Sequence, residues 1–181
     1  KYIDKNDRTN RPIFSDAGSA TLISKSDSNT IGPFEFGTDG SNYDKLIVKE
    51  GAAKSGYFKN KTPTLHMDGA AVFMFTMSTV PKSINNLLNI HGVAKEKVDM
   101  FIFHQASKVV LDNLQRGLGI LDISIYKDIG ELGNTVSSSI PIALKNADAQ
   151  SKISNEELIL ISGFGVGLSW GSCLLSWKKL L

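Results

Sequence analysis

The chain has 181 residues, of which 41% are hydrophobic and 21% charged, and its formal net charge is +2. These totals are typical of one globular domain with a sizeable core, and the small charge, without a basic run interleaved with aromatic residues, argues against nucleic-acid binding. The single cysteine excludes an internal disulfide, and the sequence shows neither a signal peptide nor an apolar run that could cross a bilayer, so we expect a cytoplasmic protein in a reducing compartment.

The first third of the chain is rich in turns and short strands. Because it begins Lys1-Tyr2-Ile3 rather than with an initiator methionine, we expect a processed or truncated piece of a longer protein. Short apolar runs separated by polar turns predict the strands of this part. The expected elements are a polar loop over 1–12, strands over 20–24, 31–38 and 46–48, and a surface excursion over 51–64.

A helical pattern begins at Asp68. The apolar residues that fall close to helical spacing are Val72, Phe73, Met77, Val80, Ile84, Leu87 and Leu88. Pro81 interrupts the pattern and predicts a kink or two consecutive helices. Gly92 stands where a helix C-terminus commonly places glycine.

The next run, from Val98 to Phe103, is nearly all apolar and predicts a strand buried on both faces. It ends abruptly at His104, and Ser107 is suited to cap a following helix over 108–116. The rest of the chain predicts a brief strand over 123–126, a loop over 127–133, a helix from 140 to about 150, and strands over 158–162 and 168–177. Strands that alternate with helices indicate an α/β domain, and the last two strands are too close for a crossover helix, so the sheet must be mixed.

His104 is the first candidate for chemistry, although a lone histidine beside an apolar run is often only packed and hydrogen-bonded. Its position favours function, because ligand-binding groups collect at the carboxyl ends of strands in α/β sheets. His66 and His91 are expected at the surface or in loops. The three histidines form no zinc pattern, and no cysteine or carboxylate cluster supplies further ligands, so no metal is expected.

Two glycine-containing stretches have more than one interpretation. Asn134 lies in G-N-T, which indicates either an Asx turn or a side-chain amide presented beside His104. The run 163–167 fails the dinucleotide pattern, since Trp170 occupies the sixth position counted from Gly165, and it leaves a tight hairpin or a backbone donor site. Cys173, in a strand-like apolar run, is expected to be a buried structural thiol.

Five stretches together carry a resemblance: F-S-D-A-G-S-A at 14–20, M-D-G-A-A-V-F at 67–73, F-H-Q-A-S at 103–107, G-N-T-V-S-S-S-I-P at 133–141 and G-F-G-V-G-L-S-W-G at 163–171. In this order they resemble the C-terminal half of β-ketoacyl-acyl-carrier-protein synthase III, of the thiolase superfamily. The resemblance implies a thiolase-like α/β fold with a mixed five-stranded sheet flanked by helices, half of an α-β-α-β-α layered fold. Residues 1–66 would then be terminal strands and an insertion of the N-terminal thiolase half, and residues 67–181 the C-terminal catalytic half.

The resemblance also implies roles for individual residues. The family's catalytic set is Cys-His-Asn, and its nucleophilic cysteine belongs to an N-terminal half that this sequence lacks; Cys173 does not match it. Three departures from the family pattern are Ser107 in place of asparagine, Val109 in place of arginine and Val166 in place of the middle glycine. The implied catalytic residues are His104, Asn134 and Gly165, and the implied lining of the pantetheine tunnel is Gly69, Phe73, Ala106 and Ser107.

The implied activity is the decarboxylative condensation of an acyl thioester with malonyl-carrier protein in fatty acid biosynthesis, without a cofactor. The implied partners are acyl carrier protein or a coenzyme A thioester, the N-terminal half of the same enzyme and, at full length, a second copy in a homodimer. We expect the chain alone to be inactive and to expose an apolar face where the other half docks. Two alternatives remain: a thiolase-fold acyltransferase that acts on coenzyme A thioesters in another pathway, and a non-catalytic piece that docks a carrier protein.

Overall fold

The computed structural model of the chain describes residues 2–49 and 63–178. Its main sheet has the strand order β1-β6-β5-β4, in which β4 and β5 run parallel and the other neighbours are antiparallel. The predicted mixed sheet is therefore confirmed. The strands are β1 (Ile31–Thr38), β4 (Met100–Phe103), β5 (Leu158–Gly165) and β6 (Ser169–Ser176).

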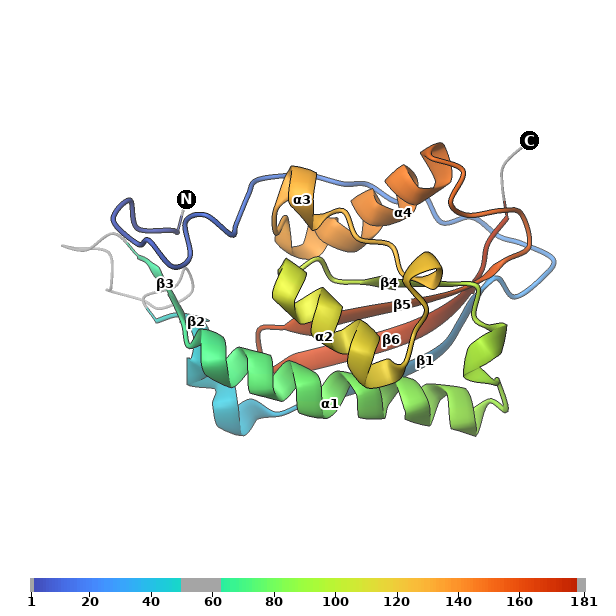
Figure 1. The fold of residues 1–181 in the computed structure, drawn as a ribbon, viewed down its shortest axis with the longest axis horizontal. Helices are drawn as coiled ribbons and strands as arrows, with labels where there is room; N and C mark the ends of the chain where they lie inside the picture. Colours follow the sequence, from blue (N-terminus) through green and yellow to red (C-terminus); the bar gives the residue numbers. More distant parts are fainter. Residues whose placement is uncertain (1, 50–62, 179–181) are drawn as a thin grey trace.

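Helices cover both faces of this sheet (Figure 1). One face carries α1 (Gly69–Ile90) and α2 (Lys108–Leu118), and the other carries α4 (Ser139–Ala149). Ile129 of the short α3 (Ile129–Leu132) packs against the core on the α1 and α2 side. Each face has its own apolar core, because the inward side chains of β4 and β5 alternate between the two. The first core contains Phe101, Phe103, Leu160 and side chains of α1 and α2, and the second contains Met100, Ile102, Ile159 and alanines of α4.

Short elements complete the described chain. A two-stranded antiparallel sheet joins β2 (Leu46–Val48) to β3 (Leu65–Met67) beside the start of α1. The surface excursion predicted over 51–64 lies almost entirely outside the described residues. Four 3-10 turns are η1 (Gly40–Lys45), η3 (Lys95–Lys97), η4 (Asp122–Ser124) and η5 (Val136–Ser138).

The expected count of five strands is wrong for the main sheet, which has four in the described part of the chain. The fifth position, beside β4, is occupied by Ile125, which forms only an isolated bridge with Phe101. A 3-10 turn takes the residues just before Ile125, so a single bond from the Tyr126 N–H to the Phe101 carbonyl, at 3.1 Å, replaces a ladder. The loop predicted over 127–133 likewise contains a short helix, α3.

Pro81 does not divide the helix in which it lies. The structure has one continuous helix of 22 residues, so the alternative of two consecutive helices is wrong. Val80 and Ile84, on either side of the proline, are fully buried in the same core. Packing on both sides therefore holds the helix against the sheet despite the missing N–H of proline.

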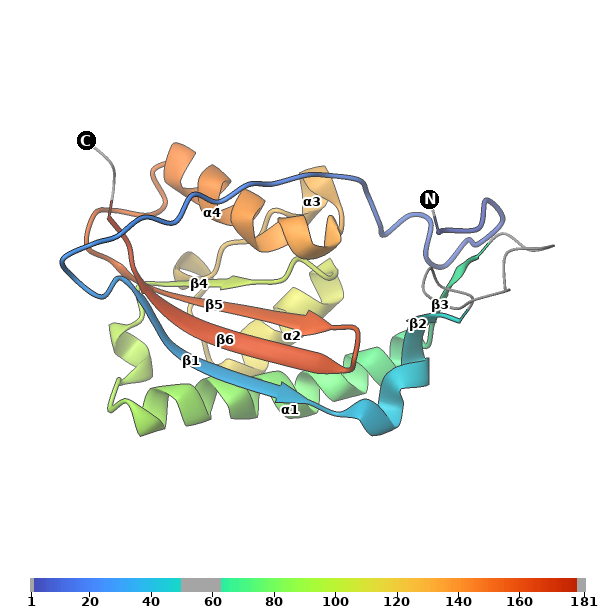
Figure 2. The same ribbon diagram turned by 180° about the vertical axis from the view of Figure 1, so that it is seen from behind.

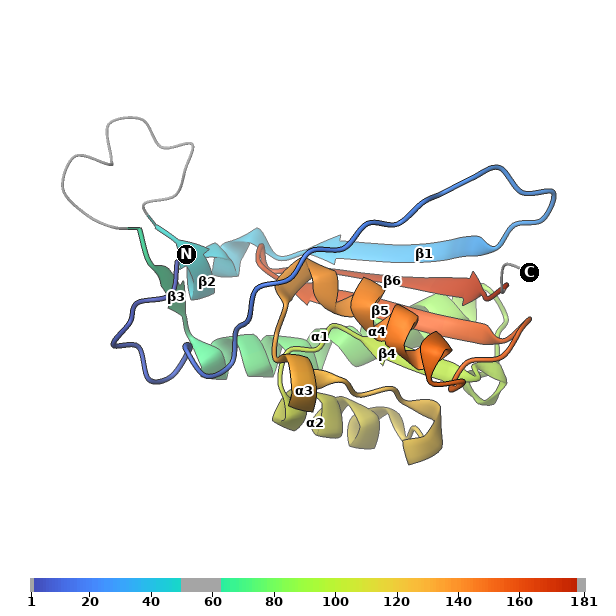
Figure 3. The same cartoon turned by 90° about the horizontal axis from the view of Figure 1, so that it is seen from above.

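The segment between residue 15 and β1 is extended but belongs to no strand, so the strand predicted over 20–24 is wrong. Figures 2 and 3 show it running alongside α4 to the far end of the molecule before the chain turns back into β1. Leu22 and Ile23 are 95% and 72% exposed. Residues with a strand pattern remain unpaired here because no neighbouring strand of the described chain is available to them.

Candidate active site

A cavity of about 700 Å³ lies where β4 ends. Its walls come from the loop after β4, the first turns of α1, the segment before α4, the β5–β6 turn and residues near the N-terminus. All seven residues that the sequence singled out line this one cavity: Gly69, Phe73, His104, Ala106, Ser107, Asn134 and Gly165. The structure thus brings together residues that are up to 96 positions apart in the chain.

His104 is held by the backbone of the neighbouring strand and by one hydroxyl group. It follows β4 directly, and its main-chain N–H donates to the Ser162 carbonyl of β5 at 2.8 Å. Its Nδ1 lies 2.7 Å from the Ser139 hydroxyl at the start of α4. The ring of Phe164 packs edge-on against the imidazole, with centroids 5.5 Å apart and an interplanar angle of 78°. These contacts fix the imidazole in the cavity wall.

Burial keeps the imidazole of His104 neutral. Desolvation lowers its pKa from 6.5 to about 4, and an interaction with the Val136 backbone opposes this only in part. At neutral pH the side chain therefore carries one ring proton and no charge. A neutral imidazole can donate one hydrogen bond through its protonated ring nitrogen, but it has no second proton to transfer to a substrate.

Asn134 satisfies both interpretations that the sequence left open. Its Oδ1 accepts the Val136 N–H at 2.9 Å, which is an Asx turn, and its Nδ2 donates to the Ala106 carbonyl at 3.3 Å. Ala106 lies two residues after His104, so this second bond places the amide beside the histidine loop. An amide nitrogen has two protons, so one remains for a ligand in the cavity that Asn134 lines.

The loop that carries Asn134 is clamped by the segment near the N-terminus. The Asn134 N–H donates to the Ile13 carbonyl at 2.8 Å, and the Asn134 carbonyl accepts from the Ser15 N–H at 3.0 Å. The Ser15 hydroxyl also donates to the carbonyl of Leu132. This short parallel pairing, centred on the bridge between Phe14 and Asn134, fixes the backbone of the asparagine.

Gln105 and Ser107 have clear structural tasks. The Gln105 amide donates to the Phe103 carbonyl at 2.8 Å and accepts the Asp128 N–H at 2.7 Å, which ties the end of β4 to the loop before α3. The Ser107 hydroxyl accepts the Val110 N–H at 3.2 Å, so the predicted N-cap of α2 is confirmed. The turn that presents His104 is therefore stabilised from both sides.

Sequence reasoning did not single out Ser139 or Phe164, which are the closest polar and aromatic neighbours of the imidazole ring described above. Both lie within the motifs quoted above: Ser139 is five residues after Asn134, and Phe164 directly precedes Gly165. A serine within a run of serines, or a phenylalanine between two glycines, shows no sequence pattern that would indicate a contact with a candidate catalytic residue. Only their contacts with His104 could identify them.

The glycine-rich run forms the turn of a hairpin, which is one of the two interpretations that the sequence left open. β5 and β6 pair from Leu158 opposite Ser176 to Gly165 opposite Ser169. Gly165 has a φ of +156°, and a Cβ added there would meet no atom within 4 Å. Gly165 also lines the cavity, so a ligand oxygen has room to approach its backbone.

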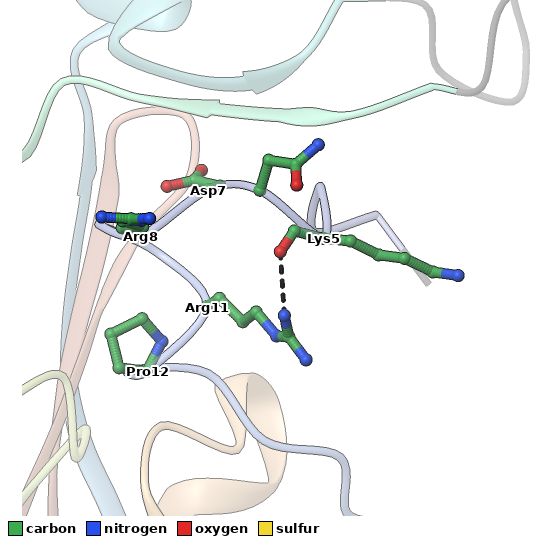
Figure 4. Close-up of a pocket in the computed structure, with 6 residues that line it drawn as sticks. Lys5, Asp7, Arg8, Arg11 and Pro12 are labelled. Carbon is green, nitrogen blue, oxygen red and sulfur yellow. Dashed lines mark hydrogen bonds between the residues drawn. The ribbon is translucent and has the colours of Figure 1, made fainter.

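Other candidate groups lie away from this cavity. His66 and His91 are exposed, as predicted, and Cys173 is buried in β6, where burial raises the pKa of its thiol. A second hollow is formed by one turn near the N-terminus, where the Arg11 guanidinium donates to the Lys5 carbonyl at 2.8 Å (Figure 4). Within residues 2–49 and 63–178, no three potential ligands gather as a metal site requires, and no helix has the length and apolar character to span a membrane.

Comparison with known proteins places these motifs in a family. The family model described as 3-oxoacyl-[acyl-carrier-protein (ACP)] synthase III C terminal matches residues 88–177. β-Ketoacyl-[acyl-carrier-protein] synthase III of Porphyra umbilicalis is 33% identical over 184 residues, which cover 98% of this chain and 56% of that protein. The enzyme of the same name from Campylobacter concisus is 32% identical over 179 residues, 97% of this chain and 54% of that protein.

Solved structures agree with the sequence comparison. β-Ketoacyl-[acyl carrier protein] synthase III from Thermus thermophilus superposes with a TM-score of 0.87 at 28% identity, over 99% of this chain and 56% of that one. The priming β-ketosynthase of the R1128 polyketide pathway gives a TM-score of 0.90 at 28% identity, over 98% of this chain and 54% of that one. The chain spans about half the length of the relatives that it matches. With the thiolase-like α/β class confirmed, residues 88–177 belong to the C-terminal part of the β-ketoacyl-acyl-carrier-protein synthase III family, and nearly the whole chain is similar to about half the length of its members.

Proposed function

We propose that this chain supplies the decarboxylation half of a β-ketoacyl-acyl-carrier-protein synthase III active site, as part of a cytoplasmic enzyme of fatty acid biosynthesis. The observation that carries the proposal is the convergence of His104, Asn134 and Gly165 on one cavity. The reaction is a condensation of an acyl thioester with a malonyl thioester. A catalytic cysteine would come from the N-terminal half, because Cys173 is buried in β6, with a raised thiol pKa, and does not line the cavity.

The chemistry explains the need for two neutral donors. When the malonyl thioester loses carbon dioxide, the bonding electron pair stays on the α-carbon and delocalises onto the thioester oxygen as an enolate. His104 and Asn134 each have a proton to offer that oxygen, and neither has a negative charge that would repel it. The pKa of about 4 favours this role for His104, because the imidazole is then a neutral donor at working pH. Preorganised donors of this kind are typically worth about 3–4 kcal/mol each in the transition state.

The second step would use the glycine turn. The enolate carbon attacks the acyl thioester on the cysteine, and the carbonyl oxygen becomes an oxyanion. When this intermediate collapses, the carbon–sulfur bond breaks, the cysteine leaves as a thiolate, and the new carbon–carbon bond remains in the product. We assign the main-chain N–H of Gly165 to that oxyanion. Support comes from the place of Gly165 in the cavity lining and from the open space beside it, where an added Cβ would meet no atom within 4 Å.

The pantetheine arm of the substrate would run past Gly69, Phe73, Ala106 and Ser107. Gly69 and Phe73 are four residues apart in the first turns of α1, so they lie on one face of that helix and extend the cavity away from His104. Both carrier-protein and coenzyme A thioesters carry such an arm. The use of coenzyme A thioesters is a second candidate, favoured by Ser107, whose hydroxyl already caps α2 and replaces the asparagine of the family pattern.

We also propose that residues 1–66 belong structurally to the N-terminal half and residues 67–181 to the catalytic half, in an enzyme that dimerises at full length. The unpaired extended segment with Leu22 and Ile23 exposed supports this division, because such a segment is suited to pair with strands of another half. The half that carries the cysteine would then cover the apolar surface beside α4.

The test is a complementation assay. The 181-residue chain is mixed or coexpressed with the cysteine-bearing N-terminal half of a relative, and condensation of an acyl thioester with malonyl-carrier protein or malonyl coenzyme A is measured. We expect turnover from the pair and none from either half. Turnover by this chain alone would contradict the proposal, and a stable carrier-protein complex without turnover in the pair would favour a docking piece.

A further inference from the structure

Ser139 is a buried hydroxyl at the junction of η5 and α4, and it touches the imidazole directly. It is 3% exposed, and its Oγ lies 2.7 Å from His104 Nδ1. The main-chain N–H of Gln105 also donates to this Oγ, at 3.4 Å. The hydroxyl is thus placed between the histidine and the residue that follows it.

The hydrogen-bonding capacity of a hydroxyl fixes the direction of the short contact. A serine hydroxyl has one proton and two acceptor lone pairs. If His104 Nδ1 carried the ring proton, Oγ would accept from both Nδ1 and the Gln105 N–H, and its own proton would have no acceptor among the recorded contacts of the described residues. A buried donor without a partner is unfavourable. If the Ser139 hydroxyl donates to Nδ1 instead, every group is satisfied.

We infer that Ser139 is a positioning residue that holds His104 in the tautomer with its proton on Nε2. A hydroxyl that donates to Nδ1 leaves Nε2 as the only protonated ring nitrogen of a neutral imidazole. In the cavity wall, that nitrogen is the one available to donate to a ligand oxygen. The catalytic meaning of this inference rests on the proposed function, in which His104 donates to the enolate, but the tautomer itself is a property of the chain without substrate.

The opposite tautomer has one specific competitor. A backbone hydrogen bond with Val136 favours the protonated imidazole, and a proton on Nδ1 would need an acceptor of this kind. That alternative would leave the Ser139 hydroxyl proton unused. The two arrangements predict opposite protonation of the two ring nitrogens, and the ring-nitrogen chemical shifts distinguish them.

The experiment is two-bond ¹H–¹⁵N correlation spectroscopy on the full 181-residue chain with ¹⁵N-labelled histidine, at pH 7. We expect His104 to show a protonated Nε2 and an unprotonated Nδ1. Ser139→Ala should shift the ratio of the two tautomers at least about fivefold towards Nδ1–H, which corresponds to the loss of one ordinary hydrogen bond. Ser139→Thr, which keeps a hydroxyl, should restore the wild-type ratio, and the exposed His66 and His91 provide internal reference signals.

Three results would overturn the inference: wild-type His104 with its proton on Nδ1, a Ser139→Ala variant with unchanged ratio, or a folded Ser139→Thr variant that resembles Ser139→Ala. If Ser139→Ala does not fold, the wild-type and threonine spectra still decide. The complementation assay separates this inference from the proposed function. An Nε2–H tautomer without turnover in the assembled enzyme would remove the condensation and keep the role of Ser139, whereas turnover with an Nδ1–H tautomer would do the reverse.

Discussion

At the scale of single residues, the site depends on groups that are buried yet keep one polar atom for a ligand. His104 and Asn134 each use part of their hydrogen-bonding capacity on the protein, through Ser139, Val136 and Ala106. The remaining N–H group of each side chain can donate a hydrogen bond to a ligand, and neither side chain is charged. Two predictions belong to this scale because each changes one such group.

The buried imidazole should make stability depend on pH. Between pH 6.5 and about 4 the unfolded chain binds a proton at His104 that the folded chain does not, so stability is lost as the pH falls through this range. The loss from this group reaches about 3 kcal/mol near pH 4.

Urea unfolding at a series of pH values should show a shallower pH dependence of the unfolding free energy for His104→Gln than for wild type. Asp16, which also lines the cavity, is present in both proteins and cancels in the comparison. Equal slopes for the two proteins would contradict the burial of a neutral imidazole, and His91→Gln, at an exposed position, is the control.

The substitution Asn134→Asp tests the role of the amide as a hydrogen-bond donor separately from its role in the Asx turn. A carboxylate can still accept the Val136 N–H and keep the Asx turn, but it has no proton to give and would repel an enolate. In the complemented enzyme we expect malonyl decarboxylation to fall by about 10²–10³-fold. The thermal unfolding midpoint should fall as well, because the carboxylate cannot replace the bond that the amide donates to the Ala106 carbonyl. Undiminished decarboxylation in a folded Asn134→Asp enzyme would remove the amide from the mechanism.

At the scale of elements, the site is held by contacts between segments that are distant in sequence. The segment over 13–15 clamps the loop before α4, and a chain of side-chain oxygens crosses the sheet from β5 to α1. In that chain Ser162 and Ser172 are 3.0 Å apart, Ser172 and Ser83 are 3.2 Å apart, and the Ser83 hydroxyl donates to Glu35 of β1. The clamp positions the backbone of Asn134. The chain of oxygens bears on the backbone of His104, since the Ser162 carbonyl accepts the His104 N–H.

Gly133 is the point at which the N-terminal clamp is most sensitive. Its φ of 69° and ψ of −167° are accessible essentially to glycine alone, and an added Cβ would lie 3.0 Å from the Ile13 carbonyl oxygen. Gly133→Ala should therefore cost about 1–3 kcal/mol in unfolding free energy and displace Asn134. Gly130→Ala is the matched control in α3, where a Cβ meets nothing within 4 Å. Equal stability of the two variants, measured by urea unfolding, would contradict the clamp.

The oxygen chain can be tested at Ser83, which is 2% exposed. Ser83→Ala leaves the half-buried Glu35 carboxylate without its hydroxyl donor, and we expect a loss of about 1–3 kcal/mol in unfolding free energy. Ser78→Ala, on the exposed side of the same helix, removes a bond to the Phe75 carbonyl and a 3.4 Å contact with the Thr79 hydroxyl, both exposed, and should be near neutral. The comparison fails if the exposed variant is destabilised as much as the buried one.

The sequence predicted elements best where the pattern was local. The bounds of β1 and β2 and the Ser107 cap agree with the structure because each depends on a run of neighbouring residues. Two consecutive helices around Pro81 and a strand over 20–24 are wrong predictions, since core packing keeps the proline within one helix and the lack of a partner strand leaves the segment over 20–24 unpaired. The placement of His104 with Asn134 came from the resemblance, and Ser139 was missed because only a tertiary contact marks it.

At the scale of the whole molecule, the outstanding feature is an exposed apolar patch on β1, on the face of the sheet that α4 covers only in part. Glu35 of β1 points towards α1, so Phe34 and Phe36 on either side of it face the opposite side, where α4 lies. The two rings stack with centroids 5.6 Å apart and are 50% and 72% exposed. A monomeric protein rarely leaves neighbouring aromatic side chains this exposed, so the patch is suited to the docking of the proposed N-terminal half.

Replacing both phenylalanines by serine should therefore affect assembly more than folding. Each buried aromatic side chain contributes roughly 1.5–3 kcal/mol, so the double variant Phe34→Ser/Phe36→Ser should bind the cysteine-bearing half at least about 100-fold more weakly and lose complemented activity. Leu121→Ser/Ile123→Ser removes two apolar side chains that are 72% and 85% exposed beside η4, away from β1, and should complement like wild type. Titration calorimetry with the purified halves measures the affinities, and circular dichroism checks that both variants are folded. If the β1 variant binds as tightly as the η4 variant, the partner half covers some other surface, because two desolvated aromatic rings cannot be lost from a docking face without weakening it.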